Sequence, residues 1–557
     1  MSHNNRTTQR FACCWLIVLT AVALLTWTVG TRSPSAQAAD LAGKPPTKTP
    51  TPTLSPSPTS TPPSGIPGGF RTSGARILNP SSGEFIIAGV NWFGFETRDA
   101  VAHGLWAQDY QFLINKVKEY GFNTIRIPYS DAMWRTNPIP NNVTACPECI
   151  GKHSRDIMAL IVNYAGSIGL HVIIDNHRSD KGNSAQANGL WYTSTYLESV
   201  WIEDWLSVQR WAHGIPQTYG SADTLTVNYY ASDGFPIILG YDLRNEPHTP
   251  SRTAYLDGAT WGSGDGIDPQ VNPNPNPFAP ACVATSTCHD WRLAAERAGD
   301  KLFGDAAANG WDYSLIFVEG IGQYPADGGT PADGPYDATW WGGDLQGVNG
   351  NSTNPGAPVV LNAGGDASGL GPAVNNKVVY SPHDYGPDEY VQQWFNSTTC
   401  YKSGCGSSSL ADVWKKYWAY INLPGGVNPV WAGHASYPWE NTGHTGYSQA
   451  PIYVGEFGTP SAEADLYSTT RGSQGQWFTD LENFVQSSYN RTTANDPGFA
   501  LTSLQWTYWA LNANNTYQIL ASDWASLDNP NKIYTHLCSI EQPPIGVTCT
   551  NTLPAPF

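Results

Sequence analysis

Eight apolar runs, each ending in polar, acidic or aromatic residues, constrain the fold of this chain more than any other feature. They span residues 85–92, 124–128, 170–177, 236–246, 315–320, 377–383, 451–456 and 502–506. Nearly continuous apolar runs are typical of parallel strands that are covered on both faces. Helix-like segments at 109–120, 156–168 and 290–302 lie between several of them. This alternation predicts an α/β fold, a (β/α)8 TIM barrel. A doubly wound sheet is the alternative, because periodicity alone does not show that a sheet closes.

Four long connections follow the carboxyl ends of predicted strands. They span residues 178–235, 248–289, 321–376 and 397–450, and they are rich in Gly, Asn, Pro, Ser and Trp. On a barrel, segments that follow the strands rise on the C-terminal face, where active sites are built. We therefore expect long loops at the C-terminal face of the strands.

The N-terminal part of the chain is not expected to belong to the barrel. Residues 1–38 read as a signal peptide, with Arg6 and Arg10 before an apolar run at 11–29 and the cleavage pattern Ala36-Gln-Ala38. An uncleaved membrane anchor is the alternative. Residues 39–67 form a Pro/Thr/Ser-rich linker, and 68–557 form the folded domain. This organisation predicts a secreted, extracellular protein that leaves the membrane after signal cleavage.

The net charge and the number of cysteines limit the kinds of partner and metal site that we expect. The formal net charge is −17, which disfavours a nucleic-acid partner. Beyond the leader, eight cysteines fall as close neighbours, and an even count in an exported chain favours disulfides over a metal site. The alternative is half a zinc site at Cys146 and Cys149, but no second Cys or His pair sits at a suitable spacing nearby. The expected pairs are Cys146–Cys149, Cys282–Cys288, Cys400–Cys405 and Cys538–Cys549.

Two glutamates end matching strands. Glu246 ends the fourth apolar run and Glu456 ends the seventh. Strands four and seven lie across a barrel from one another, so both side chains can flank one bond of a bound substrate. Paired carboxylates across a cleft carry out glycoside hydrolysis, in which one protonates the leaving oxygen and the other attacks or activates water. The alternative is that either glutamate merely caps a strand end.

Other strand-tip residues suit the same chemistry. Arg126 can keep a neighbouring carboxylate ionised. Several are side chains that can be uncharged and can form hydrogen bonds with sugar hydroxyls or with a catalytic glutamate. A tryptophan among them offers the apolar face of its indole to a pyranose ring. These candidates are His177, Asn245, His383, Tyr385 and Trp506.

Several motifs together resemble glycoside hydrolase family 5, and in particular its bacterial endo-β-1,4-glucanase branch. They are Asn245-Glu246-Pro247, Glu456-Phe-Gly458, Arg126-Ile-Pro128, His177, His383-Asp-Tyr385, Gly89-Val-Asn-Trp-Phe-Gly-Phe-Glu96, Trp340-Trp-Gly-Gly-Asp-Leu-Gln346 and Gln505-Trp-Thr507. The resemblance runs from about residue 72 to about residue 523.

The resemblance implies a retaining mechanism on a β-glucan such as cellulose, without metal or cofactor, and we expect a monomer. Glu246 would be the acid/base and Glu456 the nucleophile. Carried over by position, the supporting residues are Arg126, His177, Asn245, His383 and Tyr385, and the residues lining glucose subsites are Trp92, Trp341 and Trp506.

The preferred substrate stays open at this point. The loops at 213–234, 248–289 and 350–376 look longer than is usual for that branch. A β-mannanase, or a mixed-linkage or xyloglucan hydrolase, is the alternative on the same barrel. An inactive glucan-binding protein is the alternative from another class, although it would need neither an acid nor a nucleophile at opposing strand tips.

Overall fold

The computed structural model describes residues 69–249, 258–261, 289–322, 340–348, 358–362, 376–395, 410–423, 449–489 and 502–541. The predicted signal peptide at 1–38 and linker at 39–67 lie outside these residues. Within the described part of the chain, no helix has the length and apolar character needed to cross a membrane.

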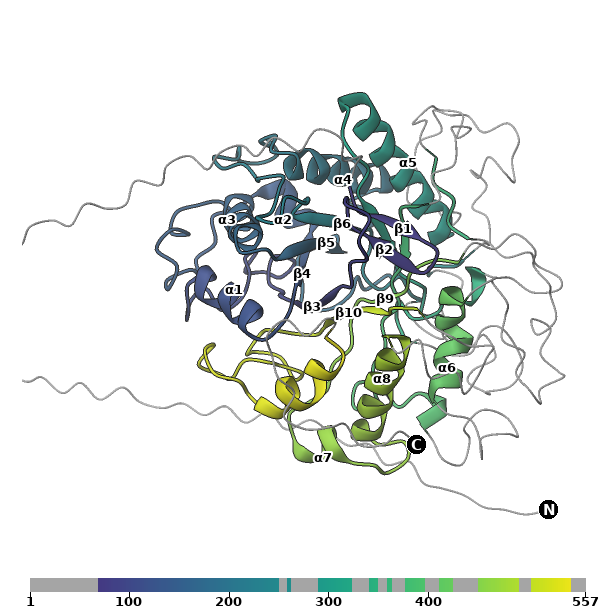
Figure 1. The fold of residues 1–557 in the computed structure, drawn as a ribbon. Coiled ribbons are helices and arrows are strands. Elements are labelled where there is room, and N and C mark those ends of the chain that lie inside the picture. The colour runs from purple at the N-terminus through teal and green to yellow at the C-terminus, as the bar shows by residue number, and fades with distance from the viewer. Residues whose placement is uncertain are drawn as a thin grey trace, which may run out of the picture. The chain divides into compact units, whose positions relative to one another are not determined.

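Eight parallel strands form a nearly closed barrel (Figure 1). Their order is β8-β7-β6-β5-β4-β3-β10-β9, and a parallel bridge between Tyr380 and Ile452 joins the two ends of this sheet. The (β/α)8 prediction is confirmed, the doubly wound alternative is wrong, and each predicted run overlaps one strand. The strands are β3 (Ala88–Asn91), β4 (Thr124–Ser130), β5 (His171–Arg178), β6 (Ile238–Asp242), β7 (Leu315–Val318), β8 (Val378–Tyr380), β9 (Tyr453–Val454) and β10 (Gln505–Tyr508).

An antiparallel hairpin precedes the barrel and packs against its interior. It consists of β1 (Arg71–Ser73) and β2 (Arg76–Leu78). Phe70 and Ile77 join a buried cluster with residues from the barrel strands, among them Ile173 and Phe317. The inside of the barrel is therefore a packed core below the strand tips, and polar chemistry is confined to the carboxyl ends of the strands.

Helices lie outside the strands and cover them (Figure 1). Asp109 and Asp290 cap the first turns of α1 and α5 with their side chains, as residues of this type do at helix starts. The helices are α1 (Tyr110–Glu119), α2 (Asp131–Thr136), α3 (Ser154–Ser167), α4 (Glu198–Ala212), α5 (Trp291–Asn309), α6 (Leu410–Tyr417), α7 (Glu463–Tyr467) and α8 (Gln474–Tyr489). Short 3₁₀ or π turns are η2 (Gln346–Val348), η3 (Gln393–Phe395), η4 (Ala419–Asn422), η6 (Lys532–His536) and η7 (Leu537–Ser539).

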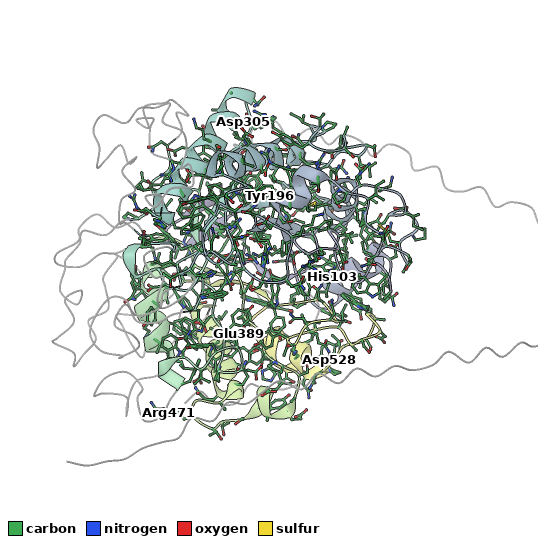
Figure 2. All side chains as sticks on the ribbon, turned by 180° about the vertical axis from the view of Figure 1, so that it is seen from behind. His103, Tyr196, Asp305, Glu389, Arg471 and Asp528 are labelled. Carbon is green, nitrogen blue, oxygen red and sulfur yellow. A yellow bond between two sulfur atoms is a disulfide. The ribbon has the colours of Figure 1, made fainter. Side chains whose placement is uncertain are left out.

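The connection at 178–235, expected as a loop, contains α4. Trp201, Trp205 and Val208 recur at helical spacing and are fully buried, so this stretch covers the barrel as one of its helices. Arg210 of α4 lies 2.6 Å from Asp305 of α5, which is labelled in Figure 2. Gly- and Asn-rich flanks concealed this helix in the sequence.

The structure contains the expected disulfide between Cys146 and Cys149, in the connection between α2 and α3. Cys538 is also disulfide-bonded, and its expected partner lies outside the described residues. The remaining predicted cysteines, Cys282, Cys288, Cys400, Cys405 and Cys549, lie outside them as well.

Gly240 lets β6 and β7 approach at the barrel wall. A Cβ atom there would lie 2.2 Å from the Leu315 carbonyl oxygen, so a side chain requires one strand to shift. We expect Gly240→Ala to lower the free energy of unfolding by about 1–3 kcal/mol, the usual cost of overpacking. Urea unfolding followed by tryptophan fluorescence measures this loss.

Gly83→Ala is the matched control. A Cβ atom there would meet the end of the Asn79 side chain rather than strand backbone, and that side chain can move. Its unfolding midpoint should stay close to that of the wild type. Equal midpoints for the two variants would contradict this account of the β6–β7 contact.

Candidate active site

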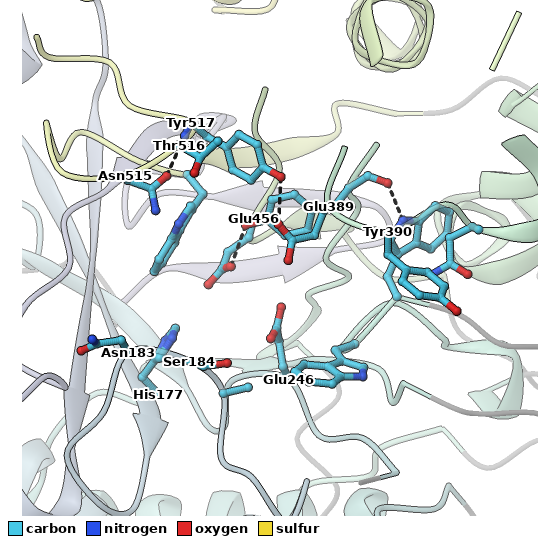
Figure 3. Close-up of a pocket in the computed structure, with 16 residues that line it drawn as sticks. His177, Asn183, Ser184, Glu246, Glu389, Tyr390, Glu456, Asn515, Thr516 and Tyr517 are labelled. Atoms are coloured by element: carbon cyan, nitrogen blue, oxygen red, sulfur yellow. Dashed lines mark hydrogen bonds between the residues drawn. The ribbon is translucent and has the colours of Figure 1, made fainter. Parts of the chain in front are cut away.

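A cavity of about 450 Å³ opens at the carboxyl ends of the strands. Glu246, which follows β6, and Glu456, which follows β9, point toward one another across it (Figure 3). The cavity is lined by His177, Asn183, Ser184, Ala185, Glu246, Trp340, Trp341, Tyr385, Glu389, Tyr390, Gln392, Glu456, Trp509, Asn515, Thr516 and Tyr517. Residues at or just beyond the ends of five predicted runs, those at 170–177, 236–246, 377–383, 451–456 and 502–506, thus meet where a barrel builds its sites.

Glu456 is held as a carboxylate. Arg126 Nη1 donates to Glu456 Oε1 at 2.7 Å, and the Tyr385 hydroxyl donates to Oε2 at 3.0 Å. Burial alone would raise the pKa of Glu456, but His383, Arg126 and the Tyr385 hydrogen bond outweigh it and lower the pKa below its ordinary value. A carboxylate that stays ionised and faces a cavity is suited to act as a nucleophile.

Glu246 has the opposite character. Its Oε1 lies 3.0 Å from His383 Nδ1, and it makes no ion pair with Arg126 among the described contacts. Burial, together with the nearby charge of Glu456, raises the pKa of Glu246 to about 7 although His383 opposes the shift. A carboxyl group that retains its proton near neutral pH is suited to act as a general acid.

The two carboxyl groups are close together. One carboxylate oxygen of Glu246 and one of Glu456 lie within 4.8 Å of each other, with a ring nitrogen of His383 inside the same limit. Their pKa values are shifted in opposite directions, so near neutral pH one can donate a proton while the other stays ionised.

Arg126 is fully buried at the centre of a polar network below the cavity. Besides Glu456, its guanidinium donates to Asp242 at 3.0 Å, Glu319 at 3.1 Å and Asn245 Oδ1 at 3.1 Å. The surrounding carboxylates raise its pKa well above the ordinary value despite its burial. Arg126 therefore remains a fixed cation beside the Glu456 carboxylate.

The two histidines at the site have different charges. His383 faces Glu246, Glu319 and Glu456, and these carboxylates raise its pKa well above the ordinary value although burial acts the other way. Burial lowers the pKa of His177 well below the ordinary value, which favours its neutral form. The sequence led us to expect neutral-capable groups at both positions, and the surroundings favour that form for His177 and the charged form for His383.

Two predicted subsite tryptophans do not line the cavity. Trp92 is fully buried and donates to the His103 carbonyl oxygen, and Trp506 is fully buried and donates to the Ile540 carbonyl oxygen. Trp506 lies inside β10, where its ring packs against Phe122 and Phe457. Both belong to the core around the barrel, which corrects the expectation that they contact sugar.

Trp509 takes the place expected for Trp506. It follows the end of β10, lines the cavity and stacks on His177 with ring centroids 5.6 Å apart and an interplanar angle of 13°. The sequence reading ended this strand at Trp506, three residues before Trp509. Extending the predicted strand to Tyr508 would have identified Trp509 as the aromatic residue at its end.

Trp340 and Trp341 both line the cavity, but they are held differently. Trp340 is 5% exposed, and its indole N–H donates to the Tyr385 carbonyl oxygen. Trp341 stacks on His248 with ring centroids 3.8 Å apart and an interplanar angle of 5°. His248 therefore orients the more accessible of the two indoles, and it belongs to the loop that begins after Pro247.

Sequence reasoning also missed Glu319 as a site residue. It is the acidic residue that follows the apolar stretch 315–318, just before Gly320, and this is the same signal that identified Glu246 and Glu456. In the structure it is fully buried and contacts Arg126, His383 and the backbone of Glu246.

The carboxylates under the cavity already have a cation. Asp175, Asp242 and Glu319 present oxygens within 4.8 Å of one another, a spacing that a metal ion could use. All three lie 3.0–3.2 Å from nitrogens of Arg126, so the guanidinium neutralises the position that a metal ion would need.

Comparison with known proteins shows which family this chain resembles. A family model described as "Cellulase (glycosyl hydrolase family 5)" matches residues 82–435. An endoglucanase of Paenibacillus polymyxa is 30% identical over 471 residues, which cover 84% of this chain and 86% of that protein. The major extracellular endoglucanase of Xanthomonas campestris pv. campestris is 28% identical over 463 residues, covering 82% of this chain and 69% of that protein.

A solved structure shares the fold. A variant of the endocellulase from Pyrococcus horikoshii, in complex with cellotetraose, is 27% identical and superposes with a TM-score of 0.55 over 84% of this chain and 97% of that chain. The family match identifies the family of the chain from its sequence, and this solved structure agrees with it in fold. The chain belongs to the cellulase family, glycosyl hydrolase family 5.

Proposed function

We propose that this protein is an endo-acting β-1,4-glucanase that hydrolyses cellulose or a related β-glucan. The observation that carries the proposal is the pair Glu246 and Glu456, which face one cavity with pKa values shifted in opposite directions. The endoglucanase relatives and the cellotetraose complex of a similar fold support the choice of substrate.

We further propose a retaining double displacement. Retaining glycosidases hold their carboxyl groups about 5–5.5 Å apart, whereas inverting enzymes need about 6.5–9.5 Å to admit a water molecule. The separation within 4.8 Å between an oxygen of Glu246 and one of Glu456 supports the retaining class. Glu456 attacks the anomeric carbon while Glu246 protonates the leaving oxygen. Glu246 then takes a proton from the water that hydrolyses the glycosyl-enzyme.

Neighbouring groups fit this sequence of steps. Arg126 and the Tyr385 hydroxyl keep Glu456 ionised and orient its two oxygens. Asn245 accepts from Arg126 through Oδ1, and its Nδ2 has no hydrogen-bond partner among the described residues. A buried donor without a partner is costly, so Nδ2 is available to a sugar 2-hydroxyl.

The aromatic lining suits a chain of pyranose rings. Trp509, Trp341 and Tyr385 present rings to the cavity, and apolar faces with a few placed polar groups are typical of small-ligand and sugar sites. The reaction uses only protein side chains as acid, nucleophile and cation, so it requires no cofactor.

The protein is proposed to act outside the cell as a monomer. The predicted signal peptide at 1–38 supports export, as does the name of the extracellular relative from Xanthomonas campestris. A soluble extracellular enzyme can reach a polymer that does not enter cells.

A panel of polysaccharides tests the substrate. We expect carboxymethyl cellulose to be cut internally, with a fall in viscosity that precedes most of the release of reducing ends. Mannan, lichenan and xyloglucan are the comparison substrates. A strong preference for mannan would overturn the glucanase proposal, and no turnover on any of the four would favour a binding protein. Glu456→Ala is the control for contaminating activity, and it should be inactive.

The pH profile tests the assignment of roles. Activity requires ionised Glu456 and protonated Glu246, so kcat/KM should fall on the alkaline side near pH 7, where Glu246 loses its proton. Its acid limb should lie below the ordinary carboxyl range because the pKa of Glu456 is lowered.

Glu246→Gln cannot donate a proton. On glucan it should lose about 10²–10⁴-fold in kcat, the usual contribution of general acid catalysis. An aryl cellobioside whose leaving group needs no proton should still form the glycosyl-enzyme, with no alkaline limb near pH 7. An unchanged alkaline limb in this variant would show that another group is the acid.

A further inference from the structure

Glu319 lies directly beneath the two catalytic carboxyl groups. It follows β7 (Leu315–Val318), its side chain is fully buried, and it does not line the cavity. It therefore touches no substrate. Nevertheless, both of its carboxylate oxygens point toward the groups that carry out the proposed reaction.

One oxygen of Glu319 holds the backbone of the acid/base. Glu319 Oε2 accepts from the Glu246 backbone N–H at 2.7 Å. Glu246 has a φ of +48°, in the left-handed region that is unfavourable for residues other than glycine. A residue keeps such a conformation only when its surroundings impose it, and the Glu319 hydrogen bond is one such restraint.

The other oxygen of Glu319 holds His383. Glu319 Oε1 lies 3.1 Å from His383 Nε2 and accepts from Arg126 Nη2 at 3.1 Å. The second ring nitrogen of His383 lies 3.0 Å from Glu246 Oε1 and 3.6 Å from Glu456 Oε2. The direction in which His383 presents its Nδ1 proton to both catalytic carboxyl groups thus depends on where Glu319 holds its Nε2.

We propose that Glu319 is the positioning residue of this site: it fixes the backbone of Glu246 and orients the His383 ring between Glu246 and Glu456. This inference rests on the proposed retaining glucanase function. It goes beyond that function because it assigns a task to a carboxylate that touches no substrate and that the catalytic steps do not use.

Contacts and burial act in opposite directions on the charge of Glu319. The N–H groups of Glu246 and Arg126 donate to its two oxygens, and His383 Nε2 lies 3.1 Å from Oε1 as an ion pair. His383 and Arg126 favour the ionised form, whereas burial and the charge of Asp242 raise the pKa of Glu319 to about 8. Glu319 therefore carries its charge on the alkaline side of the activity profile.

The charge of Glu319 also acts on the acid/base. The groups that face Glu246 and Glu319 are the cations Arg126 and His383, the neutral His177, and the carboxyl groups of Asp175, Asp242 and Glu456. Within this set the charge of Glu319 raises the pKa of Glu246. Its removal should therefore lower that pKa and move the alkaline limb of activity to lower pH.

Glu319→Gln tests the proposal because it keeps the shape of the side chain. An amide has one acceptor oxygen and one donor nitrogen, so it must place a donor against either the Glu246 N–H or the pair formed by Arg126 and His383. We expect kcat on carboxymethyl cellulose to fall about 10- to 100-fold through misplacement of the catalytic groups. KM should stay within about twofold, and the alkaline limb should move down by about one pH unit.

Glu482→Gln is the matched control. Glu482 lies on α8, is fully buried and contacts His536 Nδ1 at 2.8 Å, so it is also a buried Glu–His pair, but outside the cavity. This variant should lose stability while keeping the kcat per folded molecule and the pH profile of the wild type. If Glu319→Gln behaves in the same way, its role is purely structural and the proposal is wrong.

A measurement that requires no glucan cleavage tests the role of Glu319 independently of the proposed glucanase function. The ring nitrogens of His383 can be titrated by ¹⁵N NMR, with the signal assigned from a His383→Gln variant. Loss of the Glu319 charge should lower the pKa of His383, because Glu319 is one of the groups that raise it. An unchanged His383 titration would overturn the proposal even if the wild type cleaves no glucan. If the wild type cleaves glucan and the His383 titration is nevertheless unchanged in Glu319→Gln, the glucanase function stands and only the role of Glu319 is wrong.

Discussion

The buried guanidinium of Arg126 is the interaction on which the rest of the site depends. It lies 2.7–3.2 Å from oxygens of Asp175, Asp242, Glu319 and Glu456, which lie on or directly follow four different strands. Buried carboxylates are costly unless they are paired and hydrogen-bonded. A guanidinium stays charged and offers five donors in a fixed plane, so one side chain can serve several of them at once.

The position of Arg126 makes Glu246 and Glu456 unequal. Arg126 donates directly to Glu456, whereas the side chain of Glu246 contacts His383 and not Arg126 among the described residues. Burial raises the pKa of both carboxyl groups, and His383 lowers both, so the difference between them comes from Arg126 and the Tyr385 hydroxyl, which contact Glu456. The fold thus gives two identical side chains pKa values shifted in opposite directions, as the proposed roles of proton donor and nucleophile require.

The sequence contained the strands and the two glutamates because both depend on local pattern. An apolar run ending in an acid identifies a parallel strand and its tip wherever it occurs, and Glu246 and Glu456 stand at such tips. The tryptophans were less predictable, because a subsite indole must lie just beyond the end of its strand. The strand end at Tyr508 decides that Trp509 reaches the cavity while Trp506 stays in the core.

The contacts of Glu319 and the charge of His383 could not be predicted from local pattern for a different reason. Each depends on three or more groups from separate strands, and a one-dimensional sequence does not show which tips meet. The same holds for the stacking of His248 on Trp341, which joins loops after two different strands.

The central claim is that Glu456 attacks the sugar directly while Glu246 protonates the leaving group, which gives retention of configuration. The most direct measurement is ¹H NMR of the first products released from a cello-oligosaccharide, before the new reducing ends mutarotate. The account predicts that the β-anomer appears first and the α-anomer grows in afterwards. An initial excess of the α-anomer would contradict it, because it would require a water molecule to attack in place of Glu456.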